Sequence, residues 1–313
     1  MTFIIAILVA FVALQSAPAP ASEMVVGAGN FSPIVADLDK SIEFYHDVIG
    51  LDVPGTPASR AWGNDSALLN FLGTPTAQAR FTTARIPGST IGVEMLDFKD
   101  IDRKPVQPRL QDPGAVRLII LVRDLNAMMA RVKNANVPLV KDGAAIIRDP
   151  DGHFIEFVQP DPLPETNAPA TSNIIGAKFG LTVADLDQTL RVYRDLLGFQ
   201  PQIDSGFGAD RVTGAQVRRA TARVPGSNVQ VELAEYKGID RKPINSRIQD
   251  PGSTRFQIRV RDTDATVKAL KTASGAVITT GGNDGPIVMR TLRVALVREL
   301  NNLFLVVMAP AGQ

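Results

Sequence analysis

The sequence predicts an α+β fold made of four similar modules, each running strand, helix, strand, strand, strand. Three observations lead to this prediction. Residues 34–45 read IVADLDKSIEFY and return at 181–193 as LTVADLDQTLRVY. The same pattern occurs in weaker form at 122–125 (VRDL) and 260–263 (VRDT). The motifs IDRKP and QDPG also occur once in each half of the chain. A repeat this clear indicates modular architecture.

The repeated segment has the local chemistry of a strand that leads into a helix. Its apolar run ends at Asp37, or at Asp185 in the second copy, and an aspartate there can cap the first amides of a helix. Apolar residues then follow at the three-to-four spacing of one buried helix face. Each helix runs into a glycine, Gly50 or Gly198, which is the expected stop. The first helix is therefore predicted at residues 38–49.

The remaining elements follow from alternation and turn residues. The first module is predicted to have a strand region at 24–35, a loop at 51–66, and strands at 66–71, 79–86 and 90–98. The second has a strand at 116–121, a helix at 125–135 and a last strand at 154–158 after the turn 149–152. In the second half the same order returns, with an insertion expected around the glycine-rich residues 280–285.

The predicted domains are two halves joined by a linker. Residues 24–160 form the first domain and residues 173–313 the second. Residues 161–172 are rich in proline and connect them. Residues 1–21 are predicted to be a separate signal peptide.

Composition narrows the class of protein. The chain has 313 residues, of which 45% are hydrophobic and 21% charged, so a packed globular core is expected. The formal net charge is +1 without a basic tail, which argues against nucleic acid as a partner. There is no cysteine, which excludes disulfides, zinc–thiolate sites and thiol catalysis.

The amino-terminal residues predict export. Residues 3–14 form one apolar run, which is shorter than the roughly 20 residues that span a bilayer. Ala19-Pro20-Ala21 fits a signal-peptidase site. A periplasmic or extracellular location is expected, without other membrane association. No Lys or Arg precedes the apolar run, so the alternative is an uncleaved membrane anchor.

The seeds IVADLDKSIEFYHDVIGL and LTVADLDQTLRVYRDLLGF resemble the opening strand and helix of the vicinal oxygen chelate superfamily, the glyoxalase, bleomycin-resistance and extradiol-dioxygenase group. IRDPDGHFIEF at 147–157 resembles its closing turn and strand. The resemblance covers about residues 25–160 and 173–310. It implies that two modules curl into one cup, so we expect one cup in each half. It leaves the activity open, because the family hosts lyases, isomerases, oxygenases and metal-free binding proteins.

The resemblance also implies where a metal would be bound, by four inward-facing His, Gln or Glu side chains in each cup. The corresponding positions are Asn30, Glu94, Arg117 and Glu156 in the first predicted cup, and Lys178, Glu232, Arg255 and Val306 in the second. Divalent catalytic metals prefer imidazole and carboxylate ligands, and an arginine does not give up its proton to bind a metal. We therefore expect no metal and no cofactor in either cup.

Both histidines fall outside these positions. His46 lies on the first predicted helix and His153 in a predicted turn, so both are expected to be surface or capping residues.

The first predicted cup carries a formal charge of −1 at these positions. Arg117 is expected to lie within hydrogen-bonding distance of Glu94 or Glu156, and it could bridge both. Such a cluster is either a structural salt bridge left by a lost metal site or a device that orients a polar ligand.

The second predicted cup carries a formal charge of +1, because Val306 stands where the first has Glu156. An unbalanced cation in an apolar pocket is costly, so this cup is expected to prefer an anion held by Lys178 and Arg255. The alternative is that Glu235 or Glu299 supplies the missing charge.

Two further features have open interpretations. The Asp102-Arg103-Lys104-Pro105 loop and its copy could clamp a phosphate or carboxylate, or serve as connectors held by Asp–Arg pairs. Trp62 and Phe71 could line the mouth of the first cup or pack in the core.

The sequence thus favours an exported tandem protein with degenerate metal sites that binds a small molecule, with an anion as one option. The first alternative is a metal-dependent glyoxalase-like lyase or isomerase, or a dioxygenase, that keeps its metal through Glu94 and Glu156. The second is a structural or interaction protein. No catalytic residue is assigned.

Overall fold

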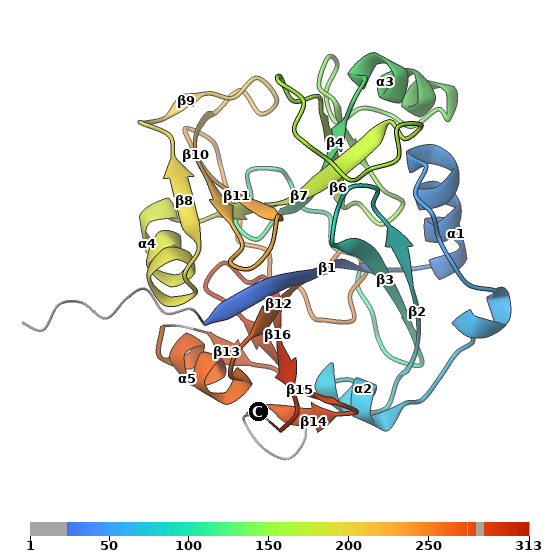
Figure 1. The fold of residues 1–313 in the computed structure, drawn as a ribbon, viewed down its shortest axis with the longest axis vertical. Coiled ribbons are helices and arrows are strands. Elements are labelled where there is room, and N and C mark those ends of the chain that lie inside the picture. The colour runs from blue at the N-terminus through green and yellow to red at the C-terminus, as the bar shows by residue number, and fades with distance from the viewer. Residues whose placement is uncertain (1–23, 274, 280–284, 313) are drawn as a thin grey trace, which may run out of the picture.

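The computed structural model describes residues 24–273, 275–279 and 285–312, and its strands form two eight-stranded sheets (Figure 1). The predicted signal peptide lies outside the described residues, as does most of the insertion expected around residues 280–285. Among the helices of the described residues, none is long and apolar enough to cross a membrane.

The first sheet, called sheet A, takes its strands from the first and fourth modules. Its spatial order is β13 (Ala276–Val277), β15 (Leu292–Arg298), β16 (Phe304–Pro310), β12 (Thr254–Val260), β1 (Val25–Val35), β3 (Gly92–Lys99) and β2 (Gln78–Arg85), with β14 (Ile287–Met289) paired to β15.

The second sheet, called sheet B, takes its strands from the second and third modules. Its order is β5 (Ile146–Arg148), β6 (Phe154–Val158), β4 (Val116–Val122), β7 (Ile174–Val183), β11 (Gln230–Lys237), β10 (Gln216–Arg223) and β8 (Gln200–Ile203), with β9 (Gly208–Ala209) paired to β10. The predicted α+β class is confirmed.

The predicted pairing of modules is wrong. The expected cups combined modules within each half, whereas each sheet joins one module from each half. β1 pairs antiparallel with β12, placing Ser32 opposite Arg255, and β4 pairs antiparallel with β7, placing Arg117 opposite Gly180. The physical reason is that local sequence sets each module but not the partner of its first strand. That partner is set by two loops that cross between the sheets, residues 100–115 and 238–253.

The crossing loops contain the repeated IDRKP and QDPG motifs and bind each other. Arg247 Nη1 lies 2.9 Å from a carboxylate oxygen of Asp102, and the equivalent Arg109 Nη1 lies 3.1 Å from Asp240. Of the two interpretations of the motif, the connector held by Asp–Arg pairs is therefore confirmed. The pairs join the two halves of the chain.

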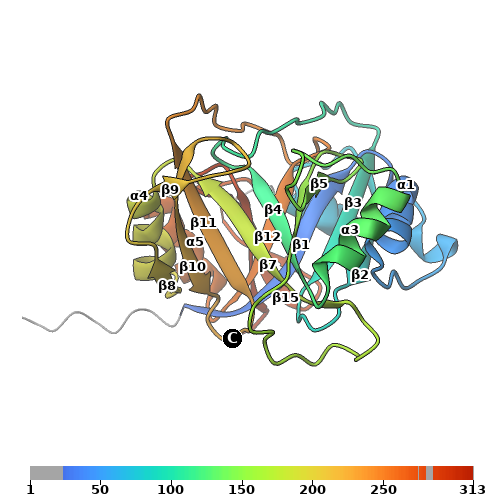
Figure 2. The same cartoon turned by 90° about the horizontal axis from the view of Figure 1, so that it is seen from above.

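Helices flank the sheets in two pairs, α1 beside α3 and α4 beside α5 (Figures 1 and 2). Asp37 and Asp185 cap their helices as predicted, accepting backbone N–H groups at 3.0 Å and 2.7 Å. Gly50 ends the first helix with φ +93°, which only glycine adopts at little cost. The helices are α1 (Leu38–Glu43) with π-helix η1 (Phe44–Ile49), 3-10 helix η2 (Pro57–Arg60), α2 (Ser66–Phe71), α3 (Leu125–Asn134), α4 (Leu186–Leu190) with π-helix η3 (Arg191–Leu196), and α5 (Thr263–Ala273).

The strand predicted at residues 66–71 is wrong, because this segment is helix α2. Asp65 caps it by accepting the N–H groups of Ala67 and Leu68, and its apolar residues Leu69 and Phe71 are buried. A run of six residues is too short for periodicity to separate strand from helix. The cap was the available signal.

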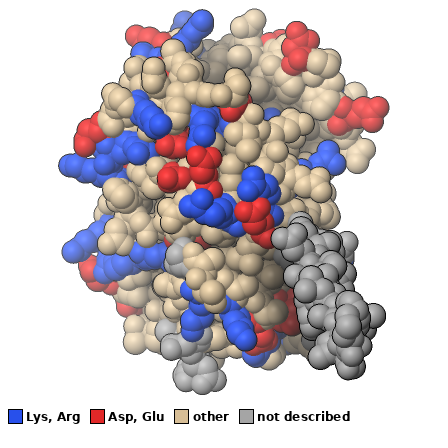
Figure 3. Space-filling model, turned by 90° about the vertical axis from the view of Figure 1, so that its left-hand side faces the viewer, with Lys and Arg blue, Asp and Glu red and all other residues tan. Residues whose placement is uncertain are grey.

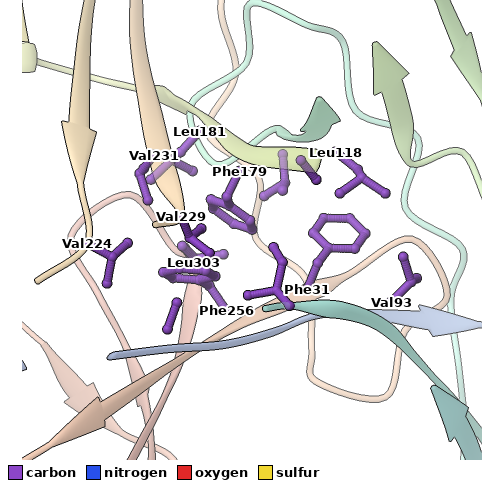
Figure 4. Close-up of a cluster of buried hydrophobic side chains, with 14 of the residues drawn as sticks. Phe31, Val93, Leu118, Phe179, Leu181, Val224, Val229, Val231, Phe256 and Leu303 are labelled. Atoms are coloured by element: carbon purple, nitrogen blue, oxygen red, sulfur yellow. The ribbon is translucent and has the colours of Figure 1, made fainter. Parts of the chain in front are cut away.

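The core lies between the two sheets. Alternate residues of each strand point inward, and Phe31 of sheet A, Phe179 of sheet B and Phe256 of sheet A meet there (Figure 4). The rings of Phe179 and Phe256 stack with centroids 4.4 Å apart. Phe31 lies 5.9 Å from Phe179. The opposite faces of both sheets therefore point away from this core and carry the residues predicted for the cups.

His153 is not a surface residue, contrary to the prediction. Its Nδ1 lies 2.9 Å from Asp149 Oδ2, and its Nε2 lies 3.1 Å from the carbonyl oxygen of Ser253 on the crossing loop of the other half. Burial would lower the pKa of His153, but the Asp149 carboxylate outweighs it and raises that pKa. The turn looked exposed because the loop that covers it is 100 residues away in sequence. His46 is exposed, as expected.

Candidate functional site

The predicted site residues lie on the outward faces of the two sheets, in a different grouping from the one expected. We call the outward face of sheet A cup A and that of sheet B cup B. Cup A contains Asn30, Glu94, Arg255 and Val306, and cup B contains Arg117, Glu156, Lys178 and Glu232. Each cup therefore takes half of its positions from each half of the chain.

A polar cluster in cup A is centred on Glu94. Oε1 of Glu94 accepts hydrogen bonds from Gln257 Nε2 at 3.0 Å, Ser32 Oγ at 3.3 Å and Arg255 Nη2 at 3.3 Å. Oε2 accepts from Asn30 Nδ2 at 3.5 Å. Sequence reasoning missed Ser32 and Gln257. Their positions two residues from Asn30 and Arg255 place them on the same strand faces, which was the available signal.

Arg255 is only partly neutralised. It is 2% exposed, and Glu94 is its one carboxylate partner among the described residues. Its Nε is buried without a hydrogen-bond partner, and the described residues supply no acceptor for Nη1. Burial lowers the pKa of Arg255, and the charge of Glu94 offsets this only in part.

Arg117 in cup B is neutralised on both sides. Its Nη1 donates to Glu156 at 2.9 Å and its Nη2 to Glu232 at 2.6 Å. Burial alone would lower the pKa of Arg117, but the charges of Glu232 and Glu156 outweigh it and raise that pKa. The predicted contact between Arg117 and Glu156 is confirmed, while Glu94 lies in the other cup. Gly180 makes room for this arrangement, because a Cβ there would lie 3.1 Å from Arg117 Nε.

A second arginine, Arg219, extends the charged network of cup B. Arg219 Nε lies 3.5 Å from Glu232, and its Nη2 lies 3.2 Å from Asp210. The side chain of Lys178 has no ion-pair or hydrogen-bond partner within the described part of the chain. On the side where α4 and β8 lie, basic and acidic side chains are intermixed at the surface (Figure 3). The visible part of this face offers no broad area of one sign.

The predicted charges of −1 and +1 do not hold, because the grouping changed. Glu94 balances Arg255 in cup A, and two acidic and two basic residues balance at the four positions of cup B. The expected anion site between Lys178 and Arg255 is wrong, because these residues lie on different sheets. Glu235 and Glu299 accept backbone N–H groups elsewhere in the fold.

Cup A contains a cavity of about 540 Å³. Glu94, Arg255 and Gln257 are the polar lining residues that belong to the cluster around Glu94, and the other polar lining residues are Ser59, Asp65, Arg80, Arg290 and Thr291. Phe71 lines it and is also buried in the apolar cluster of this face, so both interpretations of Phe71 apply. Trp62 instead packs against the guanidinium of Arg80 at 4.6 Å. The apolar lining residues are Ala61, Leu68, Leu69, Phe71, Ala79, Phe81, Leu96, Met289, Leu292, Val294, Val306 and Met308.

The donor sets of the cups do not fit a divalent metal. Cup A offers one carboxylate, Glu94, which already accepts from four side chains. The two carboxylates of cup B, Glu156 and Glu232, are bridged by Arg117. In the described ranges no group of three or more His, Cys, Asp or Glu side chains is arranged to hold a metal. A fixed guanidinium therefore occupies a predicted ligand position in each cup.

Family models match both halves of the chain. Residues 29–157 and 178–288 each match a model of the glyoxalase/bleomycin resistance protein/dioxygenase superfamily. The chain belongs to this superfamily. A lactoylglutathione lyase from Arabidopsis thaliana is 26% identical over 175 residues, which are 53% of this chain and 52% of that protein. The match thus spans about half the length of that relative.

Two solved structures share the fold over most of the chain. A glyoxalase I variant from Zea mays has a TM-score of 0.55 at 14% identity, covering 91% of this chain and 93% of its own. A proposed dioxygenase from Bacillus subtilis has a TM-score of 0.57 at 14% identity, covering 93% and 87%. At this identity the likeness concerns the fold alone. The predicted membership and the tandem glyoxalase-like architecture are confirmed.

Proposed function

We propose that this superfamily member binds a small, largely apolar molecule in cup A without a metal ion, and that cup B serves mainly to stabilise the fold. The observation that carries the proposal is the difference between the two cups. Cup A combines a cavity of about 540 Å³ with a polar end made by Glu94, Arg255 and Gln257. In cup B the carboxylates of Glu156 and Glu232 already form ion pairs with Arg117. A concave pocket that is lined mostly by apolar side chains and has a small number of polar groups is the usual form of a ligand site.

The proposal is tested by filling the cavity. Met308 lines it and is half-buried, so Met308→Trp places a bulky ring inside the pocket. Met129 is also half-buried, lies on α3 and packs against the central core, so Met129→Trp is the matched control. A library of small apolar compounds is screened by native mass spectrometry against the wild type and both variants. Compounds that bind the wild type and Met129→Trp but not Met308→Trp support the proposal. Binding that is equal in all three proteins contradicts it.

The metal-dependent alternative, a glyoxalase-like lyase or a dioxygenase, has its own test. The protein is dialysed against zinc, nickel, manganese or iron(II), desalted and subjected to elemental analysis. Because each cup places an arginine beside its carboxylates, we expect less than one ion per chain and no lactoylglutathione lyase activity. A stoichiometric metal ion, together with activity that a chelator removes, would establish the alternative. If the cavity accepts no ligand and no metal, the structural alternative gains support.

We also propose that the chain is exported. The apolar run at residues 3–14 and the Ala19-Pro20-Ala21 sequence support this proposal. A tagged chain should appear in the periplasmic or extracellular fraction without residues 1–21, and deletion of residues 2–21 should retain it in the cytoplasm. Recovery of the uncleaved chain in the membrane fraction would favour the anchored form instead.

A further inference from the structure

The two cups are built from equivalent residues, which allows a direct internal comparison. Arg117 and Arg255 lie 138 positions apart, as do Glu94 and Glu232. In both cups Nη2 of the arginine donates to the glutamate, at 2.6 Å in cup B and 3.3 Å in cup A. Half of the polar arrangement of cup B is therefore reproduced in cup A.

The other half differs at one position. In cup B, Nη1 of Arg117 donates to Glu156 at 2.9 Å. The equivalent of Glu156 in cup A is Val306, which offers no acceptor. Nη1 of Arg255 accordingly has no acceptor among the described residues, although only 3% of the side chain is exposed. Cup B thus surrounds its guanidinium with two carboxylates, whereas cup A provides one.

The cavity lies where the second carboxylate would stand. Both Arg255 and Val306 line it, so a molecule in the cavity can place an oxygen against the guanidinium while its body contacts Val306 and the apolar wall. We infer that cup A binds an apolar monocarboxylic acid whose carboxylate accepts from Nη1 of Arg255, as Glu156 accepts from Arg117 in cup B. This inference rests on the proposed ligand function of cup A.

The chemistry of the site favours this class over others. A carboxylate matches the planar fork of a guanidinium and would give Arg255 the second carboxylate partner that Arg117 has in cup B. A phosphate ester would bring a larger charge close to Glu94. An ammonium group would face the buried cation of Arg255, and a neutral amide would lack the charge that strengthens the hydrogen bond.

The test uses three probes with the same hydrocarbon chain: octanoate, octanamide and octylamine. Their affinities for the full chain are measured by calorimetry. Octanoate should bind roughly 10- to 100-fold more tightly than octanamide, which is the range expected for a charge-assisted hydrogen bond. Octylamine should bind most weakly. If octanamide binds as tightly as octanoate, the cavity remains a ligand site and the carboxylate inference is wrong. If none of the three binds, both the proposed function and this inference fail.

Two variants identify the position of the carboxylate. Val306→Glu should fold, because cup B contains the same arrangement, and its new carboxylate should take Nη1 of Arg255 and reduce octanoate binding to the level of octanamide. Thr291→Glu adds the same charge at the exposed rim of the cavity and should leave the preference intact. A preference for octanoate that survives Val306→Glu undiminished would overturn the assignment to Arg255.

Discussion

Replacing Arg117 by methionine should cost more stability than the equivalent change at Arg255. Arg117→Met leaves Glu156 and Glu232 facing each other, with side chains only 25% and 20% exposed. Glu232 keeps Arg219 at 3.5 Å, while Glu156 loses its only ion-pair partner in the described structure. Removing one partner of a buried ion pair costs about 3–5 kcal/mol, and we expect a loss in that range.

The same substitution at Arg255 is the internal control. Glu94 would keep the hydrogen bonds from Gln257, Ser32 and Asn30, so its carboxylate stays solvated by side chains. The expected loss is about 1–2 kcal/mol, the size of one hydrogen bond to a charged group. Urea unfolding of both variants at pH 7 gives the two free energies.

The pH dependence of Arg117→Met provides a second check. Burial already raises the pKa of Glu156 in the wild type, although Arg117 opposes it, and removing Arg117 should raise that pKa further. A carboxyl group whose folded-state pKa exceeds its unfolded value stabilises the fold at low pH, and this contribution is lost as pH rises through the folded-state pKa. The loss of unfolding free energy caused by Arg117→Met should therefore be smaller at pH 5 than at pH 7. Equal losses in the two variants, or a deficit independent of pH, would refute the assigned difference between the cups.

Three further predictions follow from the fold. Gly180→Ala should lower the free energy of unfolding by about 1–3 kcal/mol, because the new Cβ would crowd the Arg117 side chain; unchanged urea unfolding would show that the contact relaxes freely. Burial raises the pKa of Glu299 to about 7, well above the roughly 4.3 of an unfolded glutamate, so its contribution to stability is full below about pH 4 and is lost as pH rises through 7. Glu299→Gln should therefore flatten the fall in wild-type stability across this window, and an identical pH series for both proteins would contradict the shift. Cleavage at a protease site inserted between residues 161 and 170 should leave the halves associated on size exclusion, because each sheet contains strands of both; separation of the halves would refute the cross-half pairing.

The sequence predicted the modules because each one is locally encoded. The aspartate caps, the stop at Gly50 and the alternating strands depend on neighbours within a few residues, and they appear where expected except at residues 66–71, which form helix α2. The assignment of modules to sheets depends on contacts between the two halves, which periodicity does not report. A signal was nevertheless available. A connector held by Asp–Arg pairs was predicted for each of the two repeated loops. In the structure, Asp102 of the first loop pairs with Arg247 of the second, and Asp240 of the second pairs with Arg109 of the first. The pairs therefore join the two repeats.

For the candidate site, too, local features were predicted correctly and contacts between the two halves were not. The family resemblance correctly assigned Glu94 and Arg255 to cup positions, although to different cups, and strand alternation adds Gln257 to the face that carries Arg255. The prediction failed in the choice of neighbouring strand, because it paired each module with the other module of the same half. The charge prediction failed with it, because Arg255 and Val306 lie with Asn30 and Glu94 in cup A and not with Lys178 and Glu232.

The comparison of the cups explains how one repeated module can support two tasks. Arg117 lies on β4 and binds carboxylates on β6 and β11, so its ion pairs connect strands from the second and third modules across sheet B. Sheet A has no equivalent connection at Val306, and an apolar cavity adjoins its arginine. Substitutions around Arg117 should therefore change stability with little effect on ligand binding, whereas substitutions around Val306 should do the reverse. Because the two sets of residues lie on different sheets, stability and ligand preference can vary independently.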